Sequence, residues 1–199
     1  MLRKKVCIIG AGPSGLNSAK YALENGLLPT IFEKSNEIGG LWISLLSKTA
    51  IWDGLYSNIS YYTEQFSDHP WPKSSLIFPS AQDINKYLKS YAQRFSLENY
   101  TRFNSKIEFV EQSSDHQWKV NLIDLKTNER KTENFNYLIC ASGLHSKPRI
   151  PFIEKSNLFK GLQLHSSKFK LKDPRLQSKT VAVVIFSFSF YLIELLTNP

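Results

Sequence analysis

A chain of 199 residues with 42% hydrophobic residues can bury one full core, so we expect one complete domain and a fragment of a second. The net charge of +8 comes from basic residues spread along the sequence, which favours a solvated surface and predicts no nucleic-acid partner. Cys7 and Cys140 form neither a CxxC pair nor a disulfide framework, so we expect a reducing compartment. The apolar run after Met1–Lys5 is too short for a cleaved signal peptide, and we expect no metal site.

The first predicted unit is a strand, a glycine-rich turn, a helix and a second strand. Val6–Ile9 is a short apolar run, typical of a strand buried on both faces of a parallel sheet. The sequence Gly-Ala-Gly-Pro-Ser-Gly follows at 10–15. Apolar residues then recur at helical spacing over Pro13–Asn25, and a glycine follows in the C-cap position. Thr30–Phe32 predicts the second strand, which ends at an acidic residue.

This unit has the residue types that bind a dinucleotide. Gly10 permits the tight turn, Gly12 lets the backbone approach a pyrophosphate, and Gly15 allows close packing of the helix on the strand. The free N–H groups and the positive end of the helix dipole favour an anion, and Pro13 loses no hydrogen bond in the first turn. Glu33 ends the second strand, where its carboxylate can accept hydrogen bonds from a ribose diol. We therefore predict a dinucleotide site; the alternative is a turn that only packs.

The middle of the chain is consistent with an α/β domain. Ala81–Phe95 has apolar residues at three- and four-residue spacing and predicts an amphipathic helix. Strand-like runs then suggest a small antiparallel meander over about 105–135, formed by Ile107–Val110, Trp118–Leu122 and the segment near Asn134–Phe135, with a turn at Lys126–Glu129. Tyr137–Ala141 predicts a buried apolar strand, and its small final residues can bring the backbone close to a cofactor.

Four further motifs narrow the cofactor. Glu37–Trp42 places a second glycine pair just beyond the acidic residue. The others are Leu55–Asn58 followed by Phe66–Pro72, Ala141-Ser142-Gly143 with Pro148 and Pro151, and Phe159–Phe169 with the spacing Phe-x-Gly-x-x-x-His-x-x-x-aromatic. Together with the glycine turn, this series resembles the flavin-containing monooxygenases, which oxygenate nitrogen and sulfur atoms. The resemblance runs from Val6 to about Val184.

The resemblance implies that FAD binds at the glycine turn, that NADPH is the reductant, and that dioxygen and a small nitrogen or sulfur nucleophile are the substrates. It implies that Asn58 lies beside the flavin ring and acts there as the catalytic residue. The motifs together assign cofactor binding to Gly10, Gly12, Pro13, Ser14, Gly15, Glu33, Lys34, Gly40, Leu41, Trp42, Ser57, Asn58, Ala141, Ser142 and Gly143.

Asn58, a group of aromatic residues and His165 have alternative explanations when they are considered without the resemblance. Asn58 is then better explained as a turn residue. The aromatic residues Trp42, Tyr61, Tyr62 and Trp71 either wall a flavin pocket or belong to the core. His165 either orders the linker between the domains, as the resemblance implies, or is a satisfied structural histidine.

The chain departs from the family pattern after Lys179. Thr180–Val184 predicts the first strand of an NADPH-binding unit, but bulky residues at 185–190 replace the glycine loop of the family. β-Branched and aromatic residues there block a pyrophosphate, so we expect a defective NADPH site. We expect Val181–Leu196 to be a buried strand that leads into a short helix; the alternative, not favoured, is a membrane anchor with a basic flank at 168–179.

These observations predict an α/β fold with a doubly wound, Rossmann-like FAD-binding domain at 1–152, followed at 153–199 by a linker and the truncated start of an NADPH-binding domain. The favoured function is a flavin-dependent monooxygenase, with weak or no activity in this incomplete chain. The alternatives are a non-catalytic FAD-binding fragment, a Baeyer–Villiger enzyme, and a disulfide-reductase-like flavoprotein, for which the CxxC pair is missing. We expect a cytoplasmic protein; the alternative location is the cytosolic face of the endoplasmic reticulum membrane.

Overall fold

The computed structural model describes residues 3–43, 51–52, 54–144, 148, 150–169, 173–186 and 189–195. The helices are α1 (Pro13–Glu24), η1 (Gly40–Trp42), α2 (Ala81–Arg94), η2 (Leu97–Tyr100), η3 (Ser156–Leu158), η4 (Ser166–Lys168) and η5 (Pro174–Leu176). The strands are β1 (Lys5–Ile9), β2 (Leu28–Phe32), β3 (Thr101–Arg102), β4 (Ser105–Gln112), β5 (Trp118–Asp124), β6 (Arg130–Phe135), β7 (Tyr137–Cys140), β8 (Gln163–His165), β9 (Thr180–Phe186) and β10 (Ser189–Leu195). Of the residues used in the sequence predictions, the following lie outside the described ones: Met1, Leu2, Lys170, Lys172, Ser187, Phe188 and Leu196.

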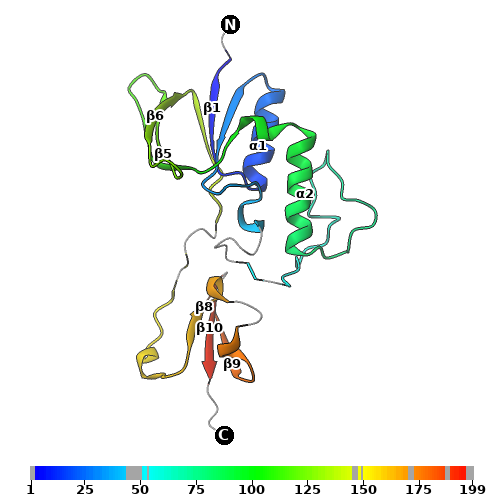
Figure 1. Cartoon of the computed structure of the whole chain (residues 1–199), viewed down its shortest axis with the longest axis vertical. Coiled ribbons are helices and arrows are strands. Elements are labelled where there is room, and N and C mark those ends of the chain that lie inside the picture. The colour runs from blue at the N-terminus through cyan, green and yellow to red at the C-terminus, as the bar shows by residue number, and fades with distance from the viewer. Residues whose placement is uncertain are drawn as a thin grey trace.

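A parallel sheet forms the centre of the amino-terminal part, with the strand order β3-β2-β1-β7. Successive residues of β1 face opposite sides of the sheet, as the strand geometry requires. Val6 and Ile8 pack against α1 and α2, whereas Cys7 packs against β5 and β6. Figure 1 shows the two helices on one side of the sheet and the meander on the other. This arrangement confirms the predicted α/β class with a parallel sheet covered on both faces.

Both long helices have sequence-encoded ends. At the end of α1, Gly26 has φ +71°, and the N–H groups of Gly26 and Leu27 donate to the carbonyl oxygens of Leu23 and Ala22. These bonds satisfy carbonyl groups that the last helical turn leaves free. At the start of α2, the side chain of Ser80 accepts from the N–H of Asp83, and the Asp83 carboxylate accepts from the N–H of Ser80. The predicted helices therefore lie where the sequence indicated, each one residue shorter at its end.

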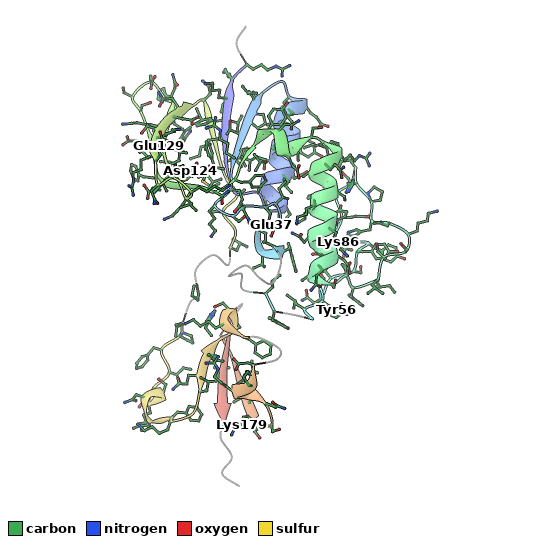
Figure 2. The ribbon with its side chains drawn as sticks, viewed as in Figure 1. Glu37, Tyr56, Lys86, Asp124, Glu129 and Lys179 are labelled. Atoms are coloured by element: carbon green, nitrogen blue, oxygen red, sulfur yellow. The ribbon has the colours of Figure 1, made fainter. Side chains whose placement is uncertain are left out.

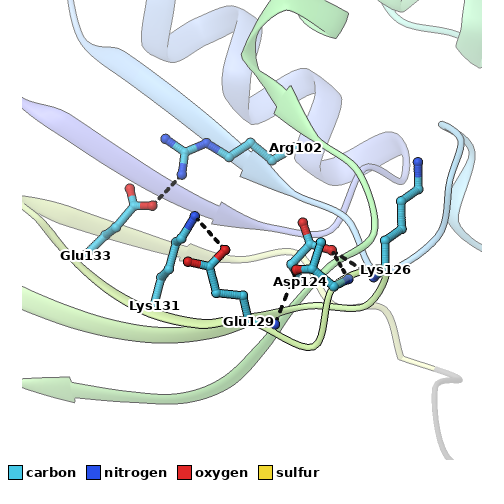
Figure 3. A network of polar contacts seen from close by, with 7 residues as sticks. Arg102, Asp124, Lys126, Glu129, Lys131 and Glu133 are labelled. Atoms are coloured by element: carbon cyan, nitrogen blue, oxygen red, sulfur yellow. Dashed lines mark hydrogen bonds and ion pairs between the residues drawn. The ribbon is translucent and has the colours of Figure 1, made fainter.

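The predicted meander is confirmed as an antiparallel sheet in the order β4-β5-β6. Its predicted turn begins at Asp124, whose carboxylate accepts from the N–H groups of Lys126 and Thr127. Figure 3 shows this turn beside an ion pair between Arg102 on β3 and Glu133 on β6. That pair and the buried contact of Phe32 with Phe135, at 5.8 Å between ring centroids, join the meander to the parallel sheet.

Strand β7 is less buried than the sequence suggested. It pairs with β1 in parallel, but in the strand order of the sheet it is an edge strand. Tyr137 is 41% exposed, Cys140 is also exposed, and the two residues between them are only half-buried. The prediction of a buried strand was wrong because an apolar run does not reveal whether both neighbours of a strand are present.

The carboxyl-terminal part contains an antiparallel sheet in the order β8-β10-β9 (Figure 1). The predicted strand after Lys179 is confirmed as β9, but two parts of the prediction are wrong: the strand is not buried, since Val183 is 51% exposed, and no short helix follows it. In its place β10 returns along β9, with Ser189 opposite Phe186 and Leu195 opposite Thr180. β-Branched and aromatic residues favour this extended form over a helix. None of the helices in the described part of the chain has the length and apolar character that a membrane crossing needs.

Candidate functional site

The glycine turn lies where β1, α1 and β7 converge. Gly10 has φ +105°, and a Cβ on it would lie 2.6 Å from the carbonyl oxygen of Ala141, just after β7. A Cβ on Gly15 would lie 1.9 Å from the carbonyl oxygen of Gly10. Neither contact leaves room for a side chain, because the opposing atoms belong to the backbone. These two glycines are therefore required for the fold itself, as the sequence predicted for Gly15.

The first turn of α1 is open to an anion. Its cap residue Gly12 is extended, with φ −80° and ψ −176°. Because glycine has no side chain, the N–H groups of the first turn receive no side-chain cap from it. The turn starts with Pro13 and contains no acidic residue. Pro13 and Ser14 are exposed. The free N–H groups and positive dipole end of such a turn attract phosphate.

Glu33 lies directly after β2 and is 5% exposed. Its Oε2 accepts from the N–H of Ala11 at 2.8 Å, and its Oε1 accepts from the N–H and the hydroxyl of Ser35 at 2.8 and 2.9 Å. An ionised carboxylate offers about four lone-pair positions, so these three bonds leave about one, on Oε2 beside the glycine turn. Glu33 thus fixes the turn and has one acceptor position left on Oε2. The neighbouring Lys34 is exposed and lies outside this buried contact.

The second glycine pair packs directly on the first glycine turn. The N–H of Gly39 donates to the carbonyl oxygen of Ala11 at 3.1 Å, and a Cβ on Gly40 would lie 2.9 Å from the Cα of Gly12. Gly39 and Gly40 have φ +139° and +58°, which favour glycine. The structure therefore brings together two segments that the sequence only suggested were related.

Asn85 is a residue of this region that sequence reasoning missed. It lies on the buried face of α2, is 7% exposed, and donates from Nδ2 to the carbonyl oxygen of Ile38 at 3.1 Å. A Cβ on Gly39 would lie 2.2 Å from the same nitrogen. Asn85 therefore holds the second glycine pair in place. A signal existed in the sequence, because a polar residue sits among the apolar positions of the predicted helix.

Leu41 and Trp42 follow in η1, where Leu41 is 37% exposed and Trp42 is half-buried. Trp42 borders two cavities of about 240 and 280 Å³. The first is lined by Pro13, Trp42, Thr63, Glu64, Gln65, Phe66, Trp71, Ile84, Tyr87 and Leu88. This cavity therefore extends from the glycine turn to the segment that follows Asn58.

Asn58 lies in an exposed bend. The bend is fixed by Ser57, which is 9% exposed; its N–H donates to the carbonyl oxygen of Pro79 at 2.8 Å, and its Oγ accepts from the N–H of Ile59 at 3.0 Å. Figure 2 shows the neighbouring Tyr56 at the amino-terminal end of α2, where it forms an isolated bridge with Ser80. Asn58 is therefore a turn residue in this structure, and its role beside the flavin ring stays a prediction.

The aromatic residues divide between core and surface. Trp71 is 7% exposed and stacks on Tyr87, with 4.3 Å between the ring centroids, so it belongs to the core while it also borders the first cavity. Tyr61 and Tyr62 stack on each other at 4.1 Å, and Tyr62 is 64% exposed. The core interpretation is thus confirmed for Trp71, and a flavin pocket walled by these aromatic residues stays a prediction.

The segment that carries Phe66 and Trp71 is joined to α1 by an ion pair between the buried Lys20 and the partly exposed Asp68. Lys20 is 7% exposed, and its Nζ lies 2.5 Å from Oδ2 of Asp68 and 2.9 Å from Oε1 of Glu24. Hydrogen bonding to Lys20 lowers the pKa of the Asp68 carboxyl below its ordinary value, and the same contacts raise the pKa of Lys20. The wall of the first cavity is therefore held in place by charge as well as by packing.

The remaining predicted residues lie at the end of β7 and in the linker. The N–H of Ala141 continues the pairing with β1 by donating to the carbonyl oxygen of Ile9 at 3.0 Å, whereas Ser142 and Gly143 are exposed. His165 caps η4, where its Nδ1 accepts from the N–H of Ser167 at 3.2 Å. This contact gives His165 a structural role. Among the described residues, no group of three or more histidine, cysteine or acidic side chains is placed to hold a metal ion.

Comparison with known proteins agrees with this geometry. The chain is 32% identical over 207 residues to the flavin-containing monooxygenase FMO GS-OX-like 8 of Arabidopsis thaliana, with 90% of this chain and 45% of that protein aligned. It is 36% identical over 177 residues to flavin-containing monooxygenase 3 of Macaca mulatta, with 84% of this chain and 33% of that protein aligned. The chain thus spans less than half the length of these relatives.

A solved structure supports the same fold. The S-allyl-L-cysteine S-oxygenase from Allium sativum superposes with a TM-score of 0.80 at 23% sequence identity, over 87% of this chain and 44% of that one. The sequence profile described as flavin-binding monooxygenase-like matches residues 3–190, which is nearly the whole chain. On this match, the chain is a member of the flavin-binding monooxygenase-like family.

Proposed function

We propose that this chain forms the FAD-binding part of a flavin-dependent monooxygenase. The observation that carries the proposal is the open first turn of α1. On one side of it Gly12 contacts Gly40, and on the other the Glu33 carboxylate has one acceptor position left. This is the donor and acceptor pattern that a pyrophosphate joined to a ribose requires.

The proposed contacts to the pyrophosphate and the ribose follow from described atoms, whereas the proposed contact of Asn58 follows from the resemblance. The N–H groups of Ser14 and Gly15, in the first turn of α1, bind the pyrophosphate, and Gly12 keeps the approach free of a side chain. The Oε2 of Glu33 accepts a ribose hydroxyl, and Asn58 orients the flavin ring. When bound, FAD supplies the redox and dioxygen chemistry, by which a soft nitrogen or sulfur atom of a small molecule is oxygenated.

NADPH does not fit the segment that the resemblance assigns to it. A dinucleotide site of this kind needs a strand, a glycine loop and the first turn of a helix. In the described residues β10 follows β9 as an antiparallel strand, so a helix start is not available there. We therefore propose that FAD binds to this chain and that NADPH does not bind at β9 and β10.

The structure and the comparisons also bear on the alternative functions. A disulfide-reductase-like flavoprotein needs a pair of reactive thiols, but burial raises the pKa of the Cys7 thiol to about 12, and this leaves the exposed Cys140 as a single thiol. A Baeyer–Villiger enzyme shares the proposed FAD site, and a non-catalytic FAD-binding fragment remains consistent with a chain that spans less than half of its relatives. Turnover separates these possibilities, since only an enzyme consumes the substrate.

The test is to purify the chain, add FAD, remove unbound cofactor and record the visible spectrum. Retained flavin absorption is expected. If no flavin is retained, the proposed FAD-binding function is wrong. The loaded chain is then reduced chemically and mixed with oxygen and either a tertiary amine, a thioether or a cyclic ketone. Oxygenation of the amine or thioether supports the monooxygenase, oxygenation of the ketone supports the Baeyer–Villiger type, and no product with flavin bound supports the non-catalytic fragment.

A further inference from the structure

The first cavity, of about 240 Å³, combines aromatic walls with a single charge. The aromatic residues that line it are Trp42, Phe66, Trp71 and Tyr87. Glu64 is the one charged side chain among the lining residues. Cavities for drug-sized molecules measure about 300–1,000 Å³, so this cavity suits a smaller ligand. The class of that ligand follows from the aromatic faces and from Glu64.

The polar side chains that border the cavity have few protons left to donate. They donate to backbone carbonyl oxygens of the protein: Thr63 to Ser60 at 3.1 Å, Gln65 to Tyr62 at 3.3 Å, Trp71 to Glu64 at 2.8 Å and Tyr87 to His69 at 2.6 Å. For all of them except Gln65, this bond uses the only donor of the side chain. A bound anion needs free donors, so these walls do not suit an anion.

Glu64 adds a negative charge that the described residues do not neutralise. Its Oε2 is buried and has no hydrogen-bond partner among them. None of the ion pairs between described residues involves Glu64. Burial raises the pKa of its carboxyl, as expected for a carboxylate that has no cation beside it. Because Oε2 is itself buried, its charge acts on the cavity through the surrounding side chains, where screening is weaker than in water.

The aromatic walls attract the same class of ligand as the carboxylate. The face of an aromatic ring carries negative charge density and attracts a cation, most strongly where water is excluded. Trp42 is half-buried, and Trp71 is 7% exposed and stacks on Tyr87 with 4.3 Å between the ring centroids. Rings that are already held in place lose little side-chain freedom when a ligand binds. Ile84 and Leu88 complete the lining and can cover apolar substituents of the ligand.

We propose that the first cavity binds a small quaternary ammonium ion, held by the aromatic faces and by the charge of Glu64. This inference goes beyond the proposed function and does not depend on it. A quaternary nitrogen has no lone pair and cannot accept an oxygen atom, so this ligand is bound without being oxygenated. The net charge of the chain is +8, which repels cations in general. Binding of an ammonium ion therefore has to come from the local arrangement in the cavity.

The experiment compares choline with dimethylbutanol, the neutral isostere in which a carbon atom replaces the quaternary nitrogen. Each is titrated into the full chain without FAD at about 0.15 M ionic strength, where attraction between exposed charges is largely screened beyond about 8 Å. The indole N–H signals in NMR spectra locate the binding, with Trp118 in the meander as the internal reference. The variants are Glu64→Gln and Trp42→Leu. Glu111→Gln, which changes an exposed glutamate on β4, is the control for the loss of a carboxylate.

Choline should bind to the wild type about tenfold more tightly than the alcohol, and it should shift the indole signals of Trp42 and Trp71 more than that of Trp118. Glu64→Gln should weaken the binding of choline by about tenfold and leave that of the alcohol unchanged, because only the charge is removed. Trp42→Leu should weaken the binding of choline by roughly three- to tenfold. Glu111→Gln should have no effect. If Trp42→Leu does not fold, Glu64→Gln decides alone.

The proposal is overturned if the wild type does not bind choline, if it binds choline and the alcohol equally, or if Glu64→Gln keeps the wild-type affinity for choline. A shift of the Trp118 signal equal to those of Trp42 and Trp71 would overturn it as well, because binding would then not be confined to the cavity. If choline binds as expected while the chain retains no FAD, the proposed function is wrong and this inference stands. The reverse result overturns this inference and leaves FAD binding in place.

Discussion

Replacing Gly15 by alanine sets two physical effects against each other. Gly15 lies in the first turn of α1, and the Cβ of an alanine would lie 1.9 Å from the carbonyl oxygen and 3.0 Å from the carbonyl carbon of Gly10. Both atoms belong to the backbone, so no side-chain rotation relieves the contact. The helix and the glycine turn must therefore move apart in Gly15→Ala.

Helix propensity alone predicts the opposite result, because alanine is favoured over glycine by about 1 kcal/mol inside a helix. Overpacking against rigid neighbours costs about 1–3 kcal/mol and exceeds this at such a short distance. We therefore expect the free energy of unfolding to fall by about 2 kcal/mol. For a chain of this size that corresponds to a melting temperature lower by roughly 4–8 °C.

Thermal unfolding followed by circular dichroism measures this effect. Gly26→Ala is the matched control, because Gly26 has φ +71° but no atom within 4 Å of a Cβ. That variant carries only the backbone strain of a left-handed residue, about 1 kcal/mol, and should leave affinity for FAD unchanged. A melting temperature of Gly15→Ala equal to or above that of the wild type would refute the packing argument.

Four further predictions concern charge and cofactor binding. Glu33→Ala removes the acceptor for three hydrogen bonds, so the free energy of unfolding should fall by about 2 kcal/mol. The affinity for FAD should fall as well, and an unchanged affinity in a titration would refute the proposed contact of Glu33 with the ribose. Hydrogen bonding to Lys20 lowers the pKa of Asp68 from 3.8, so the wild type should be more stable than Asp68→Asn in urea at neutral pH. This difference in stability should shrink as the pH falls below 3.8 and vanish below the lowered pKa of the folded protein. Burial raises the pKa of Glu64 from 4.5, so Glu64→Gln should be more stable than the wild type at neutral pH, and this difference in stability should also shrink on acidification. If Asp68→Asn and Glu64→Gln change the stability at neutral pH in the same direction, the opposite pKa shifts of Asp68 and Glu64 are contradicted. NADPH added to the FAD-loaded chain under nitrogen should leave the flavin absorption unchanged while dithionite bleaches it, and bleaching by NADPH would show that the chain has a working nicotinamide site.

The elements around the first glycine turn could be predicted because their signals are local. A buried apolar strand, a tight turn and a helix with a glycine C-cap each depend on neighbours a few residues away. The meander was predicted for the same reason, since its strand-like runs and the predicted turn at Lys126–Glu129 lie within one short stretch. Only the ends of the elements differ, by one or two residues in most cases.

The contacts that build the candidate site could not be predicted, because they join residues that are distant in sequence. The backbone of Gly12 packs against Gly40, the Glu33 carboxylate accepts a hydrogen bond from the N–H of Ala11, and the side chain of Asn85 donates one to the carbonyl oxygen of Ile38. No periodic pattern encodes which backbone groups will face one another across such separations. The glycine at position 40 was recognised from the resemblance, but its φ of +58° and its contact with Gly12 come only from the structure.

Two elements were misjudged because a single apolar run is compatible with several structures. β7 is an edge strand, although its sequence also suits a buried one. β10 is a strand because it pairs with β9 and β8, and this pairing adds to the β-propensity of its aromatic and β-branched residues. The domain boundary at 152 and the roles of the individual cofactor-binding residues stay predictions.

Gly12→Ala tests the central claim most directly, because the fold and the ligand make different demands on this position. Gly12 has an extended backbone that any residue adopts, and a Cβ there would lie 3.6 Å from the Cα of Gly40, an ordinary contact. The melting temperature should therefore stay close to that of the wild type. A pyrophosphate bound at the first turn of α1 has no room for the added methyl group, so affinity for FAD should fall by about tenfold or more, equivalent to about 1.4 kcal/mol. Equal affinity of Gly12→Ala and the wild type for FAD would contradict the account.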